Sequence, residues 1–252
     1  MPRLLQPAAA LLLAALAACT LNLRQVQDPP RSAAVATAYP WNSMVYLART
    51  DSGVLVIDLG WYGADRSLRR GLRRVGASPE EVVGVFLTHS HRDHIAGWRT
   101  VSHAPFYVSA AEVPLLEGDA HHPDLPSRTG ERLAGNPAPW HGEVEVRGFA
   151  SDTAFAFGRD TVRAFPVPGH TAGSAAYLFR GVLFVGDAVA FSYLGGFRPA
   201  FGIFTDDPKR SRASLASLWE RVRPHAPRWV CTAHGKCARP DERFMQKVLG
   251  RD

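Results

Sequence analysis

The chain has 252 residues, of which 46% are hydrophobic and 21% charged, so it can bury the core of one well-covered domain or two small ones. Its 29 Lys and Arg residues outnumber 23 Asp and Glu residues, which gives a formal net charge of +6. The excess consists of scattered arginines, such as Arg69, Arg70, Arg73 and Arg74 on one predicted helix, with no basic stripe interleaved with aromatic residues. This distribution argues against a nucleic-acid partner.

The first 18 residues are typical of a secretory signal peptide. Arg3 precedes an apolar stretch at residues 8–18, which is too short to span a bilayer. The ending Leu16-Ala17-Ala18-Cys19 resembles the lipobox of bacterial lipoproteins, which implies that Cys19 is acylated and anchors the protein to a membrane. Thr20 then implies sorting to the outer membrane, on the periplasmic side of the envelope. A cysteine that happens to end an ordinary signal peptide is the alternative.

Residues 20–38 contain Pro29-Pro30 and many Ser, Ala and Thr residues, without a helical or strand period. They are predicted to form a tether between lipid and domain. The expected organisation is therefore a signal peptide at residues 1–18, a lipid-anchored tether at 19–38 and one folded domain at 39–252.

The first part of the domain favours a strand, a helix and a second strand. Apolar runs at 44–48 and 54–59 flank Asp51-Ser52-Gly53, which predicts a β-hairpin. A helix is expected over 65–75, and a helical turn at 78–81 precedes a strand that ends at Thr88. The carboxyl end of that strand is where α/β sheets bind ligands.

The second part favours strands. Residues 117–136 are rich in Pro, Gly, Asp and His and are predicted to be a loop or mobile lid. Strands at 143–147, 161–167, 174–179 and 182–185 have the lengths of an antiparallel meander. Asp207 is expected to cap the final helix, which ends before Pro224, and a strand at 228–232 leads to His234. Whether Cys231 and Cys237 form a disulfide stays open, because spacing alone does not decide it.

The segment LTHSHRDHIAGW, residues 87–98, places His89, His91, Asp93 and His94 directly after a predicted strand. Zinc binds imidazole nitrogen and carboxylate oxygen. Alternate spacing lets His89 and His91 point the same way, while Asp93 and His94 follow where the chain turns into a helix and can face a second ion. Two such ions make a bridging hydroxide a nucleophile at neutral pH.

These residues resemble the signature of the metallo-β-lactamase fold superfamily of metal-dependent hydrolases. Further matches are VPGHTAGSAAYLF with His170, LFVGDAVA with Asp187, VCTAHGK with His234 and LVIDLG with Asp58. The resemblance covers nearly all of residues 40–240. It implies an α/β fold that is a four-layer αββα sandwich of two mixed sheets with flanking helices.

The resemblance also implies two divalent metal ions. Zn²⁺ is the expected metal, and Fe and Mn are the alternatives. Seven side chains would hold them: His89, His91 and His170 the first ion, Asp93, His94 and His234 the second, and Asp187 both. Asp58 would orient a metal-bound histidine. Asp93 would also be catalytic, as the acceptor of a proton from the bridging water.

The implied function is a dinuclear hydrolase that uses the bridging hydroxide to attack a small ester, thioester, lactone or amide in the cell envelope. Asp187 argues against a true β-lactamase, since lactamases of this fold generally carry Cys or Ser in that part of the site. Only 18 residues follow His234, which argues against the glutathione-binding helical domain of glyoxalase II. The alternatives kept open are an iron-dependent oxidoreductase, β-lactamase activity and a non-enzymatic zinc-sequestering lipoprotein.

The remaining histidines are expected at the surface, which is where such side chains usually lie: His103, His121, His122, His141 and His225. Of these, His122 and His141 lie where they could reach a substrate. Substrate-binding residues are expected in the lid, 117–142, and in the loop 191–205. The sequence identifies neither the substrate nor the oligomeric state.

Overall fold

The structure is a computed structural model that describes residues 33–37, 43–61, 63–138, 140–192, 196–200, 202–235 and 237–250. The predicted signal peptide, the lipidation site Cys19 and most of the predicted tether lie outside the described residues. Among the helices that the structure describes, each is too short or too polar to cross a membrane.

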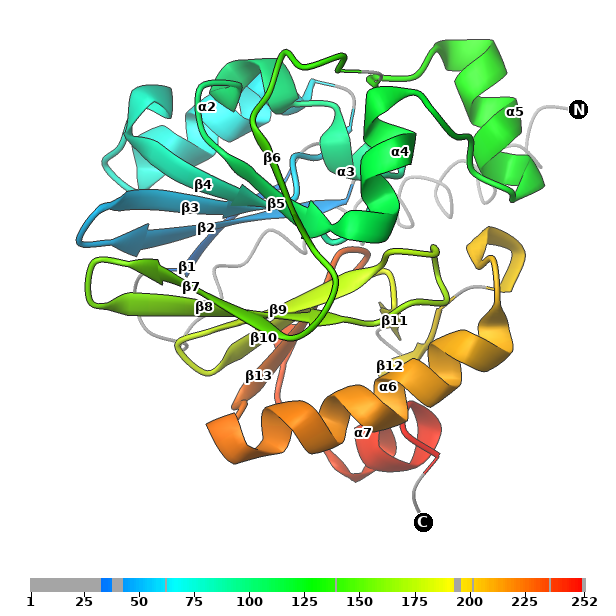
Figure 1. Ribbon diagram of the computed structural model, residues 1–252. Coiled ribbons are helices and arrows are strands. Elements are labelled where there is room, and N and C mark those ends of the chain that lie inside the picture. The colour runs from blue at the N-terminus through cyan, green and yellow to red at the C-terminus, as the bar shows by residue number, and fades with distance from the viewer. Residues whose placement is uncertain are drawn as a thin grey trace, which may run out of the picture.

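Two six-stranded sheets lie face to face, and helices cover the outer face of each (Figure 1). The first sheet has the order β1 (Ala33–Thr37), β2 (Met44–Thr50), β3 (Gly53–Ile57), β4 (Val82–Phe86), β5 (Phe106–Ser109), β6 (Val146–Phe149). The second has the order β14 (Cys237–Ala238), β13 (Trp229–Thr232), β10 (Val182–Gly186), β9 (Ala175–Phe179), β8 (Asp160–Pro166), β7 (Thr153–Phe157). Strands β11 (Val189–Ser192) and β12 (Gly196–Pro199) form a separate pair. The four-layer αββα sandwich is therefore confirmed.

Helices form the two outer layers. Over the first sheet lie α2 (Ala64–Arg74), α3 (Arg92–Ile95), α4 (Val113–Glu117) and the 3₁₀ turns η1 (Pro79–Glu81), η2 (Trp98–Val101) and η3 (Ala110–Glu112). Over the second lie α6 (Pro208–Val222), η5 (Arg223–His225) and α7 (Glu242–Lys247). Helix α5 (Leu125–Ala134) lies near α4 at one end of the sandwich, and η4 (Gly202–Phe204) precedes α6 (Figure 1).

Strand alternation produces three hydrophobic layers. On β2, Leu47 faces outward and packs with Leu68 of α2, whereas Tyr46 faces the second sheet and packs with Phe184. This is the two-residue period expected of a strand that is buried on both faces. A third core joins the outer face of the second sheet to Trp219 of α6 and the C-terminal helix α7.

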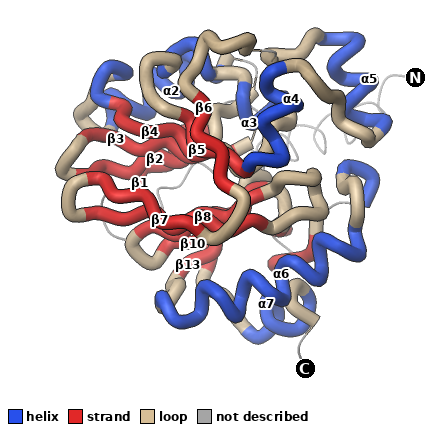
Figure 2. The backbone as a smooth tube through the Cα atoms, in the orientation of Figure 1, coloured by secondary structure: helices blue, strands red, loops and turns tan. Residues whose placement is uncertain are grey.

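The sandwich brings several strand ends to one edge. Strand β3 pairs with β4 in parallel, and β10 pairs with β13 in parallel, so the carboxyl ends within each pair lie together. Figure 2 shows β3 beside β4 and β10 beside β13. The chain leaves these strands at Asp58, Leu87, Asp187 and Ala233. Four of the sequence motifs therefore meet at one edge of the two sheets.

The expected hairpin, the helix after it and the capped helix α6 are confirmed, with Asp207 Oδ1 accepting a hydrogen bond from Arg210 N at 2.9 Å. Helix α6 is followed by a further helix, α7, so the expectation that it is the last one is wrong. Strand pairing also begins earlier than expected, because β1 lies within the predicted tether and pairs with β2. The domain division at residue 39 itself stays a prediction.

The expectation of an irregular segment at 117–136 is also wrong. Helix α5 forms there, with the Asp124 carboxylate accepting from Ser127 N at 2.7 Å and Pro126 in the first turn. A capping aspartate and a proline in the first turn indicate the start of a helix even where the sequence has no apolar periodicity. The segment has no apolar periodicity that would mark a helix, so only its two end signals predict one.

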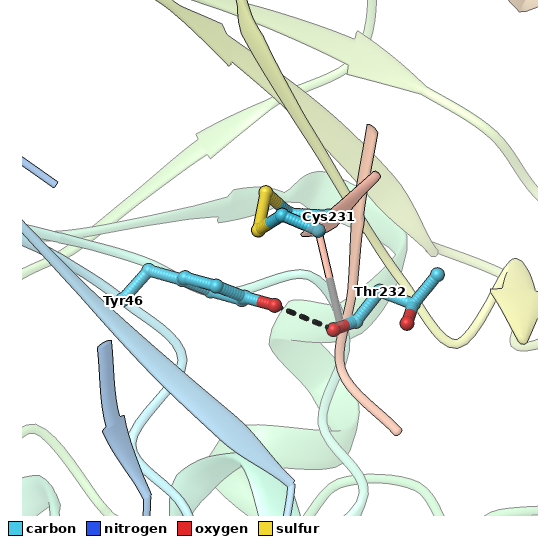
Figure 3. Close-up of a disulfide and its surroundings, with 4 residues drawn as sticks. Tyr46, Cys231 and Thr232 are labelled. Carbon is cyan, nitrogen blue, oxygen red and sulfur yellow. Dashed lines mark hydrogen bonds between the residues drawn. A yellow bond between two sulfur atoms is a disulfide. The ribbon is translucent and has the colours of Figure 1, made fainter. Parts of the chain in front are cut away.

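Cys231 and Cys237 form a disulfide between β13 and β14 (Figure 3). Beside it, Tyr46 Oη of the first sheet donates a hydrogen bond to the carbonyl of Thr232 at 2.7 Å (Figure 3). Both contacts hold the end of β13, two residues before His234. The inter-sheet hydrogen bond fixes this ligand-bearing loop relative to the first sheet.

Candidate metal centre

Three imidazole rings from two separate loops meet at the edge of the sandwich. His89 Nε2 lies 3.0 Å from His91 Nδ1, and His170 Nε2 lies 3.2 Å from each of these atoms. All three side chains are buried. Ligand atoms about 2.0 to 2.2 Å from one tetrahedral zinc lie roughly 3.3 to 3.6 Å apart. The three nitrogens lie a few tenths of an ångström closer together than this, so a small outward shift of the rings would let them hold a single cation. We call these three side chains the first cluster.

A second cluster lies next to it. His234 Nε2 is 3.1 Å from Asp93 Oδ2 and 3.1 Å from Asp187 Oδ2, and His94 Nε2 is 3.6 Å from a carboxylate oxygen of each aspartate. Asp187 Oδ2 also lies 3.8 Å from His170 Nε2 of the first cluster. Its carboxylate therefore sits between the two clusters, where a bridging ligand would be. The donor set, nitrogen and carboxylate oxygen, is the one that zinc prefers.

The structure brings together all seven side chains that the sequence selects, and their function as ligands stays a prediction. The nitrogens and oxygens of each cluster lie close enough to hold an ion. Buried polar atoms without a hydrogen-bond partner also point into the site, namely His94 Nε2 and Asp187 Oδ1. Such orphaned atoms are rare in folded proteins unless an ion or water completes them.

The outward nitrogen of each buried histidine faces an oxygen. His94 Nδ1 donates to Asp58 Oδ2 at 2.9 Å, and His89 Nδ1 lies 3.1 Å from Thr88 Oγ1. Thr88 Oγ1 gives its own proton to Asp58 Oδ2 at 2.8 Å, so it accepts from His89. His170 Nδ1 faces Thr205 Oγ1 at 3.4 Å. These contacts leave the inward nitrogens as lone pairs, the form that binds a metal.

Asp58 stands where its predicted orienting role requires. It is 2% exposed and has a φ of 56°, a left-handed conformation that a non-glycine residue adopts at a cost. Its carboxylate accepts from Thr88 N at 2.8 Å as well as from Thr88 Oγ1 and His94. One buried carboxylate thus fixes the strand end that begins the metal-binding segment.

Gly186 makes the approach of the two sheets possible. Its φ is 52°, and a Cβ at this position would lie 2.4 Å from Thr88 Oγ1. Any side chain would push β10 away from the β4 end. Asp187, the next residue, would then move away from the first cluster.

Sequence reasoning missed Glu112, a fully buried carboxylate behind the first cluster. Its Oε2 accepts from Ser90 N at 2.8 Å and from Ser90 Oγ, and its Oε1 accepts from Thr171 Oγ1 at 2.6 Å and Gly173 N at 2.9 Å. Ser90 lies between His89 and His91, and Thr171 follows His170. Glu112 therefore joins the two ligand loops. A lone glutamate in a short helical segment carries no sequence signal for this.

His122 was expected at the surface, and this is wrong. It is 3% exposed, and its ring centroid lies 4.5 Å from that of His91. Its Nε2 lies 3.2 Å from Ser90 Oγ. Because Ser90 Oγ donates to Glu112, His122 Nε2 is the donor in this contact. His103, His121, His141 and His225 are exposed, as expected.

Asp124 was also missed. One oxygen of its carboxylate caps α5, and Oδ2 lies 3.6 Å from His91 Nε2. The outward nitrogen of His91 thus faces a carboxylate beyond hydrogen-bond distance, whereas His94 donates a hydrogen bond to Asp58. Proline and polar neighbours hid this residue within a segment that looked irregular.

The pKa values of the histidines differ between the two clusters. Burial and then repulsion from His91 lower the pKa of His170 to about 3, and burial likewise lowers the pKa of His89. Burial alone would lower the pKa of His234 too, but Asp187 and Asp93 outweigh it and raise the pKa to about 10. His170 and His89 are therefore neutral imidazoles at pH 7, while His234 holds a proton until a cation replaces it.

A cavity of about 620 Å³ opens above the two clusters. Asp93, His170, Asp187 and His234 line its floor. A cavity of this size, with a few convergent polar groups, is what a small-molecule site requires.

The sequence pattern of the metallo-beta-lactamase superfamily matches residues 38–234. The chain belongs to this superfamily. It is 26% identical over 228 residues to the uncharacterized protein YobT of Bacillus subtilis, covering 81% of this chain and 88% of that one. It is 27% identical over 183 residues to a hydroxyacylglutathione hydrolase of Aeromonas hydrophila, covering 70% of this chain and 56% of that enzyme.

Among solved structures, the metallo-beta-lactamase from Pontibacter korlensis matches with a TM-score of 0.65 at 20% identity, covering 90% of this chain and 97% of that one. This likeness concerns the fold. The chain spans just over half the length of the hydroxyacylglutathione hydrolase. With the family and the His/Asp clusters together, this superfamily member is a metal-dependent hydrolase.

Replacing Asp124→Asn is expected to weaken zinc binding at the first cluster by about 10- to 100-fold, because His91 loses the carboxylate charge that lies 3.6 Å from its outward nitrogen. Asparagine caps helices as well as aspartate, so α5 should persist. Competition with a chromophoric chelator measures the affinity. Asp241→Asn, the same change at the α7 cap, is the matched control. Equal affinities in the two variants would contradict the role of Asp124.

Glu112→Gln is expected to lower the free energy of unfolding by about 2 to 3 kcal/mol, because one amide group would face two buried donors. Urea denaturation with chelator present measures this without a metal contribution. The control is Glu81→Gln, which alters a capping carboxylate that is partly exposed and accepts from Ser78 N. A loss no larger than in the control would show that Glu112 does not hold the two loops.

The second ion is expected to bind more tightly as pH rises from 6 to 8, by about tenfold per unit for each proton released. The sign follows from His234, whose pKa of about 10 means that its proton must leave first. The first ion should show little such dependence, since His170 and His89 are already neutral. Zinc stoichiometry at buffered free zinc checks this. Parallel pH dependence of both ions would refute it.

Proposed function

We propose that the protein is a dinuclear zinc hydrolase that cleaves a small ester, thioester, lactone or amide. The observation that carries this is the position of Asp187, whose one carboxylate lies within 3.1 Å of His234 Nε2, 3.6 Å of His94 Nε2 and 3.8 Å of His170 Nε2. An anionic oxygen between two cations lowers their mutual repulsion. The arrangement therefore supports two ions rather than one.

Bound together, two zinc ions would polarise a substrate carbonyl and bring the pKa of a coordinated water close to 7. The chain's own residues would do the rest. Attractions to His94 and His234 outweigh the cost of burial and hold the pKa of Asp93 well below its usual range, so its carboxylate is ionised. Asp93 lines the cavity and can orient the water and accept its proton. The proton would later pass to the leaving group.

The proposed location is the cell envelope, with a lipid anchor at Cys19. This part of the proposal is supported by the signal-peptide pattern and the lipobox resemblance in residues 1–20. Radiolabelled fatty acid incorporated into the full chain, and lost in Cys19→Ser, would support it.

The function is tested with the lipid-free domain, residues 20–252, purified with its metal content measured in the same preparation. We expect two zinc ions per chain and hydrolysis of at least one compound in a panel of esters, thioesters, lactones and amides. Chelator should abolish turnover, and added zinc should restore it. Two bound zinc ions without hydrolysis of any compound would favour zinc sequestration, and iron with redox activity would favour an oxidoreductase.

Asp93→Asn separates chemistry from metal binding. An amide oxygen can still face the second ion but accepts no proton at neutral pH. We expect kcat to fall by about 10²- to 10⁴-fold, the usual contribution of general acid–base catalysis. Retained metal with unchanged turnover would refute this role of Asp93.

A further inference from the structure

The walls of the cavity differ sharply from its floor. The floor consists of the metal-centre side chains, whereas the walls carry Trp61, Pro126, Val189, Ala190, Ile203 and Phe204. Apolar walls around a few convergent polar groups fix which part of a ligand faces which surface. The group that reacts must lie at the floor, and whatever is attached to it must lie against hydrocarbon.

Two of the wall residues are unusually exposed. Ile203 is 71% exposed and Phe204 is 43% exposed, and Leu133 is the remaining large hydrophobic side chain with such exposure among the described residues. Ile203 and Phe204 lie on η4, which contacts α5 across the cavity mouth. Exposed apolar residues gathered at a concave site are typical of a surface that a ligand covers.

Charge recognition is weak at these walls. Arg92 is the one Lys or Arg among the described lining residues, and its Nη1 donates to the carbonyl of Gly130 in α5 at 2.6 Å. Its guanidinium also lies 5.5 Å from the ring centroid of Trp61. Arg92 therefore fastens α5 over α3 and stiffens the wall. A substrate with an anionic tail finds little here that favours it.

We propose that the substrate is an ester or thioester whose acyl group is an apolar chain. The carbonyl would lie over the two clusters, and the chain would run along Val189 and Ala190 to Ile203 and Phe204. This inference rests on the proposed function for the reaction, but the apolar site itself is independent of turnover. Hydrolysis would add water across the acyl bond and release a fatty acid and an alcohol or thiol.

Turnover is tested with p-nitrophenyl esters from acetyl to octanoyl on the zinc-loaded domain. We expect kcat/KM to rise on the order of 100-fold from acetyl to octanoyl, since full burial of each CH₂ is worth about fourfold and burial along an open mouth is partial. A succinyl ester, with an anionic tail, should be hydrolysed no faster than the acetyl ester. Equal kcat/KM across the series would overturn the proposal and leave the hydrolase function standing.

Binding provides the second readout. Calorimetric titration of the same protein with octanoate and with acetate compares two carboxylates that differ in the apolar chain alone. We expect octanoate to bind at least about 30-fold more tightly. If octanoate binds tightly but no ester is hydrolysed, the apolar site stands and the proposed reaction fails. Equal affinities overturn the apolar site whatever the turnover.

Variants test where the acyl chain of the substrate lies in the cavity. Phe204→Ser and Ile203→Ser should each lower the ratio of octanoyl to acetyl kcat/KM by about 5- to 10-fold. Leu133→Ser is the matched control, because Leu133 is 83% exposed and is absent from the cavity lining. It should leave the ratio within twofold of the unchanged protein. An equal effect of all three variants would show that surface hydrophobicity, not the cavity, sets the preference.

Discussion

The candidate metal centre depends on imidazole nitrogens whose lone pairs are held facing one another, about 3 Å apart. His89, His91 and His170 face their nitrogens together at 3.0 to 3.2 Å, an arrangement that is unfavourable unless a cation lies among them. Free side chains would rotate away, so the rest of the structure must keep them in place. It does so with an oxygen that faces each outward nitrogen and with two buried carboxylates, Asp58 and Glu112, that accept hydrogen bonds from the backbone of the two histidine-bearing loops. The residues directly behind the three histidines therefore keep these side chains in place.

The sandwich explains why these partners can meet. Asp58 leaves β3 and the HxHxDH segment leaves β4, whereas Asp187 and His234 come from the ends of β10 and β13 in the other sheet. Backbone hydrogen bonds cross between the two halves at this edge, from Ala175 N to the carbonyl of Thr88 and from Met44 N to the carbonyl of Ala233, each at 2.8 Å. The second cluster draws ligands from both sheets. Separation of the sheets would separate the ligands.

Local patterns predicted most of the fold, and local patterns together with the family resemblance selected all seven side chains that gather at the site. A hairpin turn, capped helices and a strand followed by HxHxDH are signals contained in a few consecutive residues, and the resemblance supplied the distant partners His170, Asp187 and His234. Glu112 was not predicted because its function depends on four hydrogen-bond donors in two other loops. The residues next to Glu112 in the sequence give no sign of these donors. His122 escaped because a histidine near proline and aspartate usually lies in solvent. Helix α5 escaped because its caps, not its periodicity, define it.

The segment that sequence reasoning found hardest to interpret is also the one that joins specificity to the metal centre. Asp124 caps α5 with one oxygen and faces His91 with the other, so the position of the cavity wall and the orientation of a metal-facing imidazole share one carboxylate. Arg92, between His91 and Asp93, holds the same helix through a hydrogen bond to the carbonyl of Gly130. A displacement of α5 would therefore act on His91 as well as on the apolar mouth. In the proposed hydrolase, substrate fit and metal geometry would be coupled through Asp124 and Arg92, so that a wall without catalytic groups would affect the chemistry at the floor.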